Sequence, residues 1–507
     1  MRINFFLIFF LIVGYHKISF AQDVSNKSYP YDPASKASSD ISKGEVLQFS
    51  FKHSKLYPGT SRSYWVYIPK EYNPGKPACL FVCMDAVMFN APTVFDYLIA
   101  TKEMPVTIGV FIQSGSIMKN DSTVIRYNRT NEFDNMNDRF ARFVEEEILP
   151  DVMKQKTSGG NPINISHDAN DHAIAGASSG AICAFTAAWQ RPDLFSRVFS
   201  AIGTYIGMRG GDQYPVLIRK TEPKAIRIYL QDNNNDTWNP LFGNWYKANI
   251  DMEAALNFAG YEVTHMWQEG GHDIRPATAI FADGMRWLWK GWPVPVKSGW
   301  SANDMLKAIL DTNELWQQVV PKTLSDKLPA VNNNTALLPE GNQYILQEGT
   351  ISYKVKGKTV VMDNDASLGD ALAVSPDKTQ LVVSGKHSHW LYDYIIQPGG
   401  KLTEKQRLYW LHNPGNDDTS EIHSFAFDTN GNLYVATEIG VQICDQNGRV
   451  RAILSLPGGS VASLWFDPEN LDTLYVTSGA KIYKRKLKVT GAPSSQKAIK
   501  PVSQGEG

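Results

Sequence analysis

Two serines lie side by side in "GASSGA", residues 176–181, where a short apolar run ends and a helical pattern begins. Gly176, Ser178 and Gly180 fit the pattern G-x-S-x-G. A sharp turn from a strand into a helix, with small residues on both sides, exposes a serine oxygen above a sheet, as a nucleophile requires. The spacing therefore predicts that Ser178 is a nucleophile and that the backbone N–H of Ser179 helps to hold an oxyanion.

A serine hydroxyl attacks a carbonyl only when a base takes its proton and an acid orients that base. Two later loops supply both groups. "EGGHD" places His272 in a Gly-flanked loop, and "LQDNNND" places Asp232 and Asp236 after a strand-like segment. We expect His272 to be the base. We favour Asp236 as the acid and keep Asp232 as the alternative, because Asp232 comes directly off the strand and can cap the turn.

Further residues are expected around these three. A second oxyanion donor should come from the loop after "CLFVCMD", where Ala86 and Val87 are both open candidates. Trp238, Trp245 and Tyr205 lie in loops near the expected site and are candidates for stacking on a phenolic or sugar ring. Ordinary packing is an equally good interpretation of each of these aromatic residues.

The elements that must position these loops lie between residues 45 and 295. Short apolar runs at 77–85, 106–113, 172–176 and 225–232 are typical of strands buried on both faces. Helical patterns separate them. Strands that alternate with helices predict an α/β domain with a doubly wound, mostly parallel sheet.

The periodicity changes in the last third of the chain. Three segments share the plan of strand, Asp-centred turn and strand, at a spacing typical of propeller blades: 371–384, 425–437 and 464–478. Residues 344–363 are strand-like and could supply a fourth blade. The predicted division of the chain is a signal peptide at 1–21, the α/β domain at 45–295, a linker at 296–343, a smaller all-β propeller-like domain at 344–490 and a flexible tail at 491–507.

Composition and the first residues limit the partners. The 507 residues exceed what one core organises, and 50 Lys and Arg against 51 Asp and Glu give no basic excess for nucleic acid. Arg2, the apolar run 5–13 and "SFA" at 19–21 are typical of a signal peptide, and the run is too short to span a bilayer. We expect a periplasmic or secreted protein without a membrane span, and its oligomeric state stays open.

Residues 45–295 resemble the esterase family that includes enterochelin esterases and the feruloyl and acetylxylan esterases of carbohydrate esterase family one. The resembling segments follow one another along the domain: "MDA", "NRTNEFDNMNDRFARFVEEEILPDV", "IAGASSGA", "RPDLFSRVFSAIG", "YLQDNNND", "GNWYKANIDMEAALNFAGYEV" and "EGGHD". The resemblance implies an α/β-hydrolase fold, a triad of Ser178, Asp236 and His272, and ester hydrolysis through an acyl-enzyme.

Export and this resemblance favour feruloyl or acetyl esters on plant polysaccharides as substrates. A siderophore esterase of the enterochelin type is the alternative enzyme, and a non-catalytic glycan-binding protein is the alternative from another class. These three functions differ in the ester that the chain hydrolyses, or in whether it hydrolyses one at all.

Residues 345–490 resemble the C-terminal part of a gluconolactonase/regucalcin-type propeller. The resemblance implies a divalent-metal site built from Glu, Asn and Asp side chains near the propeller axis. Asp370 stands where that family has Asn, and "EIHSFAFD" replaces a later "D-G" pattern. We therefore expect an accessory domain with no metal, and we expect no cofactor in the chain.

Overall fold

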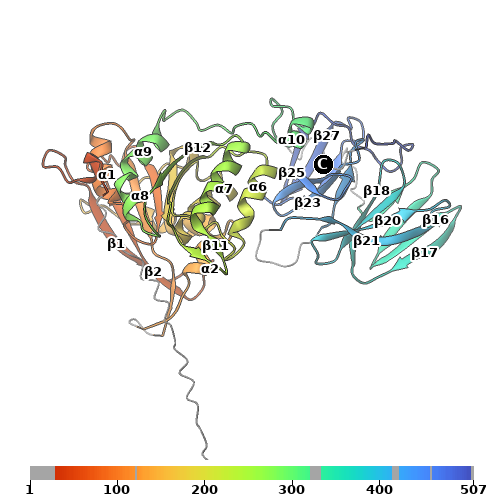
Figure 1. Ribbon diagram of the computed structural model, residues 1–507, viewed down its shortest axis with the longest axis horizontal. Helices are drawn as coiled ribbons and strands as arrows, with labels where there is room; N and C mark the ends of the chain where they lie inside the picture. The colour runs from red at the N-terminus through yellow and green to blue at the C-terminus, as the bar shows by residue number, and fades with distance from the viewer. Residues whose placement is uncertain (1–28, 120–122, 320–332, 414–421, 457–458, 504–507) are drawn as a thin grey trace, which may run out of the picture.

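The computed structural model describes residues 29–119, 123–319, 333–413, 422–456 and 459–503. An α/β domain and an all-β domain lie next to each other along the long axis of the molecule (Figure 1). The predicted signal peptide, residues 1–21, lies outside the described residues. Within the described ranges, no helix combines the length and the apolar composition needed to cross a bilayer.

A ten-stranded mixed sheet forms the centre of the N-terminal domain, in the order β12-β9-β8-β7-β3-β4-β2-β5-β6, with β1 also paired to β2. The strands from β12 to β4 are parallel, and the pairs beyond β4 are antiparallel. The bounds are β1 Glu45–Phe51, β2 Thr60–Ile68, β3 Cys79–Met84, β4 Thr107–Ile112, β5 Ser116–Met118, β6 Val124–Tyr127, β7 His172–Ala177, β8 Arg197–Ala201, β9 Arg227–Asn233 and β12 Glu262–Gln268. The predicted α/β domain with a mostly parallel sheet is confirmed.

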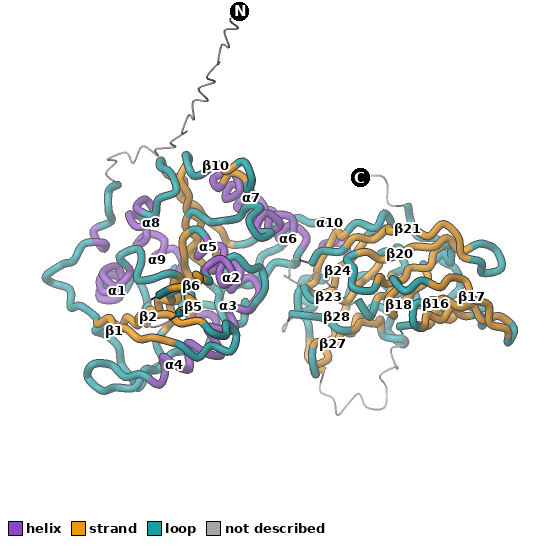
Figure 2. The backbone as a smooth tube through the Cα atoms, turned by 90° about the horizontal axis from the view of Figure 1, so that it is seen from below, coloured by secondary structure: helices purple, strands orange, loops and turns teal. Residues whose placement is uncertain are grey.

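Helices cover both faces of this sheet, which is why β3, β7 and β8 are buried at every position (Figure 2). One apolar core joins one face to α1 and α9, and another joins the opposite face to the helices from α3 to α7. The bounds are α1 Ala91–Ala100, α2 Arg129–Phe133, α3 Arg139–Phe143, α4 Leu149–Lys154, α5 Ser179–Gln190, α6 Tyr214–Lys220, α7 Trp245–Phe258, α8 Arg275–Ala279 and α9 Phe281–Trp289. A wider π turn at Val144–Ile148 joins α3 to α4.

Four antiparallel four-stranded sheets form the C-terminal propeller. The predicted repeats are the two inner strands of three blades, and the segment 344–363 supplies three strands of another. In chain order the blades are β14 Thr335–Leu337, β15 Gln343–Gln347, β16 Thr350–Val355 and β17 Lys358–Asn364; β18 Leu368–Val374, β19 Gln380–Gly385, β20 Trp390–Ile396 and β21 Leu402–Trp410; β22 Phe425–Phe427, β23 Leu433–Thr437, β24 Gly440–Cys444 and β25 Val450–Leu454; and β26 Ser463–Phe466, β27 Thr473–Ser478 and β28 Lys481–Lys486 with β13 Gln317–Val319.

The structure differs from the predicted domain bounds at both ends of the propeller. The segment 296–343, predicted as a linker, contains α10 (Asp304–Ile309), β13 and β14, and β13 pairs with β28 in the last blade. In the predicted tail 491–507, the N–H of Ala492 donates to Phe427 O at 2.8 Å, and the N–H of Ile499 donates to Pro376 O at 3.0 Å. Three-residue strands carry too little alternation to be recognised in a sequence.

The two domains share a packed interface, where α6 and α10 lie against β25 (Figure 1). Arg485 on β28 is nearly buried, at 2% side-chain exposure, and forms a two-pronged ion pair with Glu222, with distances of 2.8 and 2.9 Å. The Arg485 Nε also donates to the carbonyl of Glu314 at 2.8 Å. The guanidinium therefore joins the end of the α6 segment to the last blade.

We predict that Arg485→Ala lowers the free energy of unfolding by about 3 kcal/mol, because it leaves the mostly buried Glu222 carboxylate without its cation. Arg142→Ala, which removes an exposed i,i+4 pair with Glu146, is the matched control. It should change the free energy of unfolding by less than about 0.5 kcal/mol. Urea unfolding followed by tryptophan fluorescence measures both. Equal losses in the two variants would contradict a structural role for the buried pair.

Candidate active site

Ser178 occupies the turn between β7 and α5, with φ 58° and ψ −122°. Its N–H donates to Ala201 O on the neighbouring strand β8 at 3.0 Å. The chain approaches itself closely on both sides of the turn. A Cβ on Gly176 would lie 2.2 Å from Gly180 O, and one on Gly180 would lie 3.1 Å from Met84 Cβ. Gly176 is therefore required by the close contact of strand and helix, and Gly180 leaves room for Met84 on β3.

The loops that carry Asp236 and His272 follow β9 and β12, which are neighbouring parallel strands. Residues 233–235, all asparagine, join the two loops by donating to carbonyl oxygens of the second: Asn233 Nδ2 to Gly271 (2.8 Å), Asn234 N to Gln268 (2.8 Å) and Asn235 N to Gly270 (2.9 Å). These hydrogen bonds hold the histidine loop at a fixed distance from the aspartate loop. No local sequence pattern indicates this role for the three asparagines.

The structure brings Ser178, His272 and Asp236 into one hydrogen-bonded series. The Ser178 Oγ lies 2.9 Å from His272 Nε2, and His272 Nδ1 lies 2.7 Å from Asp236 Oδ1. The Asp236 side chain is fully buried, whereas His272 keeps 26% of its side-chain surface exposed. The hydrogen bonds of Asp232 go instead to Asn233 N and Asn249 Nδ2. The carboxyl group that contacts the imidazole is therefore that of Asp236.

Two further side chains hold these groups in place. Thr204 Oγ1 lies 3.2 Å from Ser178 Oγ and accepts a hydrogen bond of 3.2 Å from Trp245 Nε1. The threonine can therefore donate its own proton to Ser178, which leaves the serine proton for His272. The Trp245 ring also packs edge-on against the imidazole, with 5.8 Å between centroids. Trp245 is only 6% exposed, so it supports the site from within and does not present a face for substrate stacking.

The loop after β3 lies beside the serine turn, where the second oxyanion donor was expected. Asp85 has φ 75° and forms a two-pronged ion pair with Arg129 at 2.8 and 2.9 Å. Arg129 also contacts Ala177 O at 3.4 Å, so it ties this loop to the end of β7. The roles of Ala86, Val87 and the Ser179 N–H as oxyanion donors stay predictions.

The predicted aromatic residues differ in exposure. Tyr205 is 1% exposed, its hydroxyl bonds Ser200 and its ring packs against Phe185, so it belongs to the core and not to a substrate surface. Trp238 is 67% exposed. It begins a short hairpin, β10 (Trp238–Asn239) with β11 (Gly243–Asn244), directly after Asp236. Leu241 and Phe242 in the turn of this hairpin are also exposed, which the sequence analysis did not single out.

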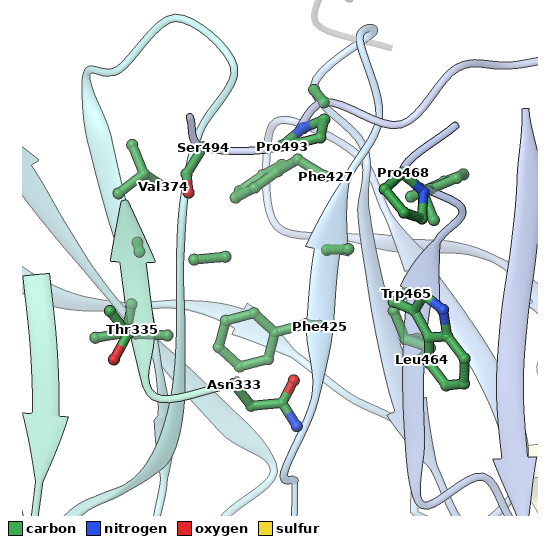
Figure 3. A pocket seen from close by; sticks show the side chains of 16 residues that line it. Asn333, Thr335, Val374, Phe425, Phe427, Leu464, Trp465, Pro468, Pro493 and Ser494 are labelled. Carbon is green, nitrogen blue, oxygen red and sulfur yellow. The ribbon is translucent and has the colours of Figure 1, made fainter. Parts of the chain in front are cut away.

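The propeller holds a separate cavity of about 290 Å³ between its four inner strands (Figure 3). Phe425, Phe427 and Trp465 line it together with the polar side chains of Asn333 and Thr335. The alanines at the centre of the inner strands leave the axial space open: Ala336, Ala373 and Ala426. This is an aromatic-lined axial cavity rather than a charged one.

The metal site that the propeller resemblance implies is not supported by the side chains present. Both carboxylate oxygens of Asp370 contact His423 Nδ1, at 2.9 and 3.0 Å. In the part of the chain that the structure describes, no group of three or more His, Cys, Asp or Glu side chains could hold a metal ion. The donor set at Asp370 therefore does not fit the divalent metal of that family.

Comparisons with known proteins divide the chain in the same way. Residues 57–290 match the family described as "Putative esterase", and residues 336–480 match the SMP-30/Gluconolactonase/LRE-like region. The N-terminal domain is therefore similar to this esterase family over residues 57–290. The propeller is similar to the gluconolactonase-like region and follows the domain that matches the esterase family. A search of curated protein sequences gave no match.

Among solved structures, the N-terminal domain is similar to a ferulic acid esterase, at 17% identity and a TM-score of 0.36 over 48% of this chain and 98% of that one. It is also similar to the enterobactin esterase of Shigella flexneri, at 22% identity and a TM-score of 0.37 over 52% and 63% of the two chains. A third similar structure is the feruloyl esterase module of Clostridium thermocellum, at 11% identity and a TM-score of 0.38 over 52% of this chain and 95% of that one. At these values, the likenesses say nothing about the substrate of this chain.

Proposed function

We propose that the chain is an exported serine esterase that hydrolyses carboxylic esters through an acyl-enzyme, with feruloyl or acetyl esters on plant polysaccharides as its substrates. The observation that carries this proposal is the hydrogen-bonded series of Asp236, His272 and Ser178 at the carboxyl end of a parallel sheet. The match of residues 57–290 to an esterase family supports the reaction class.

In the proposed mechanism, His272 Nε2 takes the proton of Ser178 as the serine oxygen attacks the ester carbonyl, and then gives that proton to the departing alcohol. Asp236 accepts a hydrogen bond from Nδ1, keeps the imidazole in the required tautomer and stabilises the imidazolium that forms. The N–H of Ser179 and one from the loop at Ala86 or Val87 hold the oxyanion. Water then repeats the cycle on the acyl-enzyme.

The surroundings of the triad favour an aromatic acyl group over acetyl. Trp238, Leu241 and Phe242 expose 67%, 83% and 37% of their surface on the hairpin that follows Asp236. Large apolar side chains at such exposure, next to a catalytic residue, suit an apolar part of the substrate. The ring of a feruloyl group offers that part, whereas an acetyl group has only a methyl.

Two alternative functions can be distinguished from this one by a single panel of substrates. The first is a siderophore esterase of the enterochelin type, which would use the same serine chemistry on a different ester. The aromatic-lined cavity of the propeller favours the non-catalytic alternative, a protein that only binds a glycan. A panel of p-nitrophenyl acetate, methyl ferulate, acetylated xylan and a catecholate trilactone separates the three functions.

Export is part of the proposal and rests on the N-terminal sequence alone. If residues 1–21 are a cleaved signal peptide, protein recovered from the periplasm or the medium should begin near Gln22, as N-terminal sequencing would measure. An uncleaved chain retained in the cytoplasm would contradict export and leave the esterase proposal unchanged.

We predict that Ser178→Ala lowers kcat by about three orders of magnitude or more on every ester that the wild type hydrolyses. Ser179→Ala keeps its backbone N–H and should retain most of the activity, so it is the matched control. Initial rates on the four-member panel measure both. Hydrolysis by Ser178→Ala at the wild-type rate would overturn the esterase assignment of this site.

We predict that Trp238→Ala raises KM for methyl ferulate by about 10-fold while KM for p-nitrophenyl acetate changes little, because the exposed ring contacts only a large acyl group. Trp292→Ala, at an exposed tryptophan distant in sequence from the triad loops, serves as the control for a general loss of stability. Equal changes in KM for both esters would exclude Trp238 from the acyl site.

A further inference from the structure

A second carboxyl group lies buried behind the triad. Asp232, near the end of β9, is 0% exposed. Its Oδ1 accepts from Asn233 N at 2.6 Å, and its Oδ2 accepts from Asn249 Nδ2 on α7 at 2.7 Å. Its carboxyl is also within side-chain hydrogen-bonding reach of Asp236. Two carboxyl groups in contact away from water cannot both be ionised without a large electrostatic cost.

The hydrogen bonds of Asp236 show where a proton is needed. Its Oδ1 faces His272 Nδ1 at 2.7 Å and also accepts from the N–H of Thr237. Its Oδ2 is buried, and among the described residues no N–H or hydroxyl group donates to it. A buried acceptor without a donor is costly. A proton on the neighbouring Asp232 would satisfy this oxygen.

The environments of the two carboxyl groups decide which one holds the proton. Asp236 contacts the imidazole and accepts from a backbone N–H. Burial, and after it the contact with Asp236, raises the pKa of Asp232 well above the usual aspartate range. The partners that surround Asp232 are neutral apart from Asp236: α7 presents the amide of Asn249, and the segment after β8 presents the carbonyl of Gly203 to that amide. The loop after β12 carries His272, which bonds Asp236, and Asp273, which pairs with Arg275.

We propose that Asp232 is a positioning residue whose protonated carboxyl donates a hydrogen bond to Asp236 Oδ2 and so directs Oδ1 toward His272. This inference rests on the proposed function, because it acts through the triad and not on the substrate. It gives the pair a single negative charge, located on the carboxylate that bonds the imidazole. It also gives Asp232 a role other than that of the alternative triad acid.

The test measures the reactivity of Ser178 directly, so it does not depend on the ester specificity. Diisopropyl fluorophosphate forms a P–O bond with an activated serine and expels fluoride, and the proton of the serine passes to the base. The rate of this labelling on the full chain is followed by intact mass from pH 5 to 9 for the wild type, Asp232→Asn and Asp232→Ala. Asn replaces a neutral acid with a neutral amide that can still donate to Asp236, whereas Ala cannot.

We expect Asp232→Ala to label about 10- to 100-fold more slowly, because Asp236 and His272 lose their alignment. Asp232→Asn should restore the rate to within about threefold of the wild type, since an isosteric donor replaces the acid. The midpoint of the low-pH limb of the labelling rate should be the same in Asp232→Asn as in the wild type. Asp96→Ala removes another buried carboxylate of the same domain, bonded to Tyr67 and Gly44, and should label like the wild type.

Several results would overturn the proposal. Labelling of Asp232→Ala at the wild-type rate would exclude a positioning role. A low-pH midpoint that moves to lower pH in Asp232→Asn would mean that Asp232 carries a negative charge in the wild type. If Asp232→Ala does not fold, the low-pH midpoint of labelling in Asp232→Asn tests the proposal without it. Failure of the proposed function gives a different result, because neither the wild type nor Asp96→Ala would then be labelled at Ser178. That result would also exclude the positioning role of Asp232.

Discussion

The backbone of Ser178 occupies a conformation that costs an L-residue about 1–3 kcal/mol, with φ 58° and ψ −122°. The surrounding structure must supply that free energy. The N–H of Ser178 bonds β8, its carbonyl accepts from Thr204 N, and Gly176 allows the helix to approach the strand. Because β7 lies between β3 and β8 with every position buried, the strain is supported by the most enclosed part of the sheet. The serine can relax only if that packing is broken.

Local patterns explain why the serine turn could be predicted from the sequence. The glycines around Ser178 act within five residues, and the periods of the flanking strand and helix are visible in the same window. Asp236 and His272 could be predicted because each follows a strand in the expected order. The choice between Asp232 and Asp236 depends on three-dimensional contacts, since both are buried at the end of the same strand and only one reaches the imidazole.

Other parts of the site depend on contacts between distant residues, and no local signal reveals them. Trp245 and Tyr205 both lie in or beside loops and carry similar sequence signals, yet the first packs against His272 and the second is buried beside Phe185. The asparagines 233–235 resemble an ordinary polar loop until their carbonyl partners near His272 are known. In the propeller, β13 is three residues long and becomes a strand only because β28 offers an unpaired edge.

The pairing of β13 with β28 also affects the order in which the chain can fold. The last blade needs one strand made before the first blade and three made after all the others. Closing such a long loop carries a large entropic cost, so this sheet should form late, after the local hairpins of the other blades. During synthesis, β13 emerges long before its partner. Until the C-terminal residues leave the ribosome, the propeller therefore lacks its last blade, which is the blade that carries Arg485 and contacts the α/β domain.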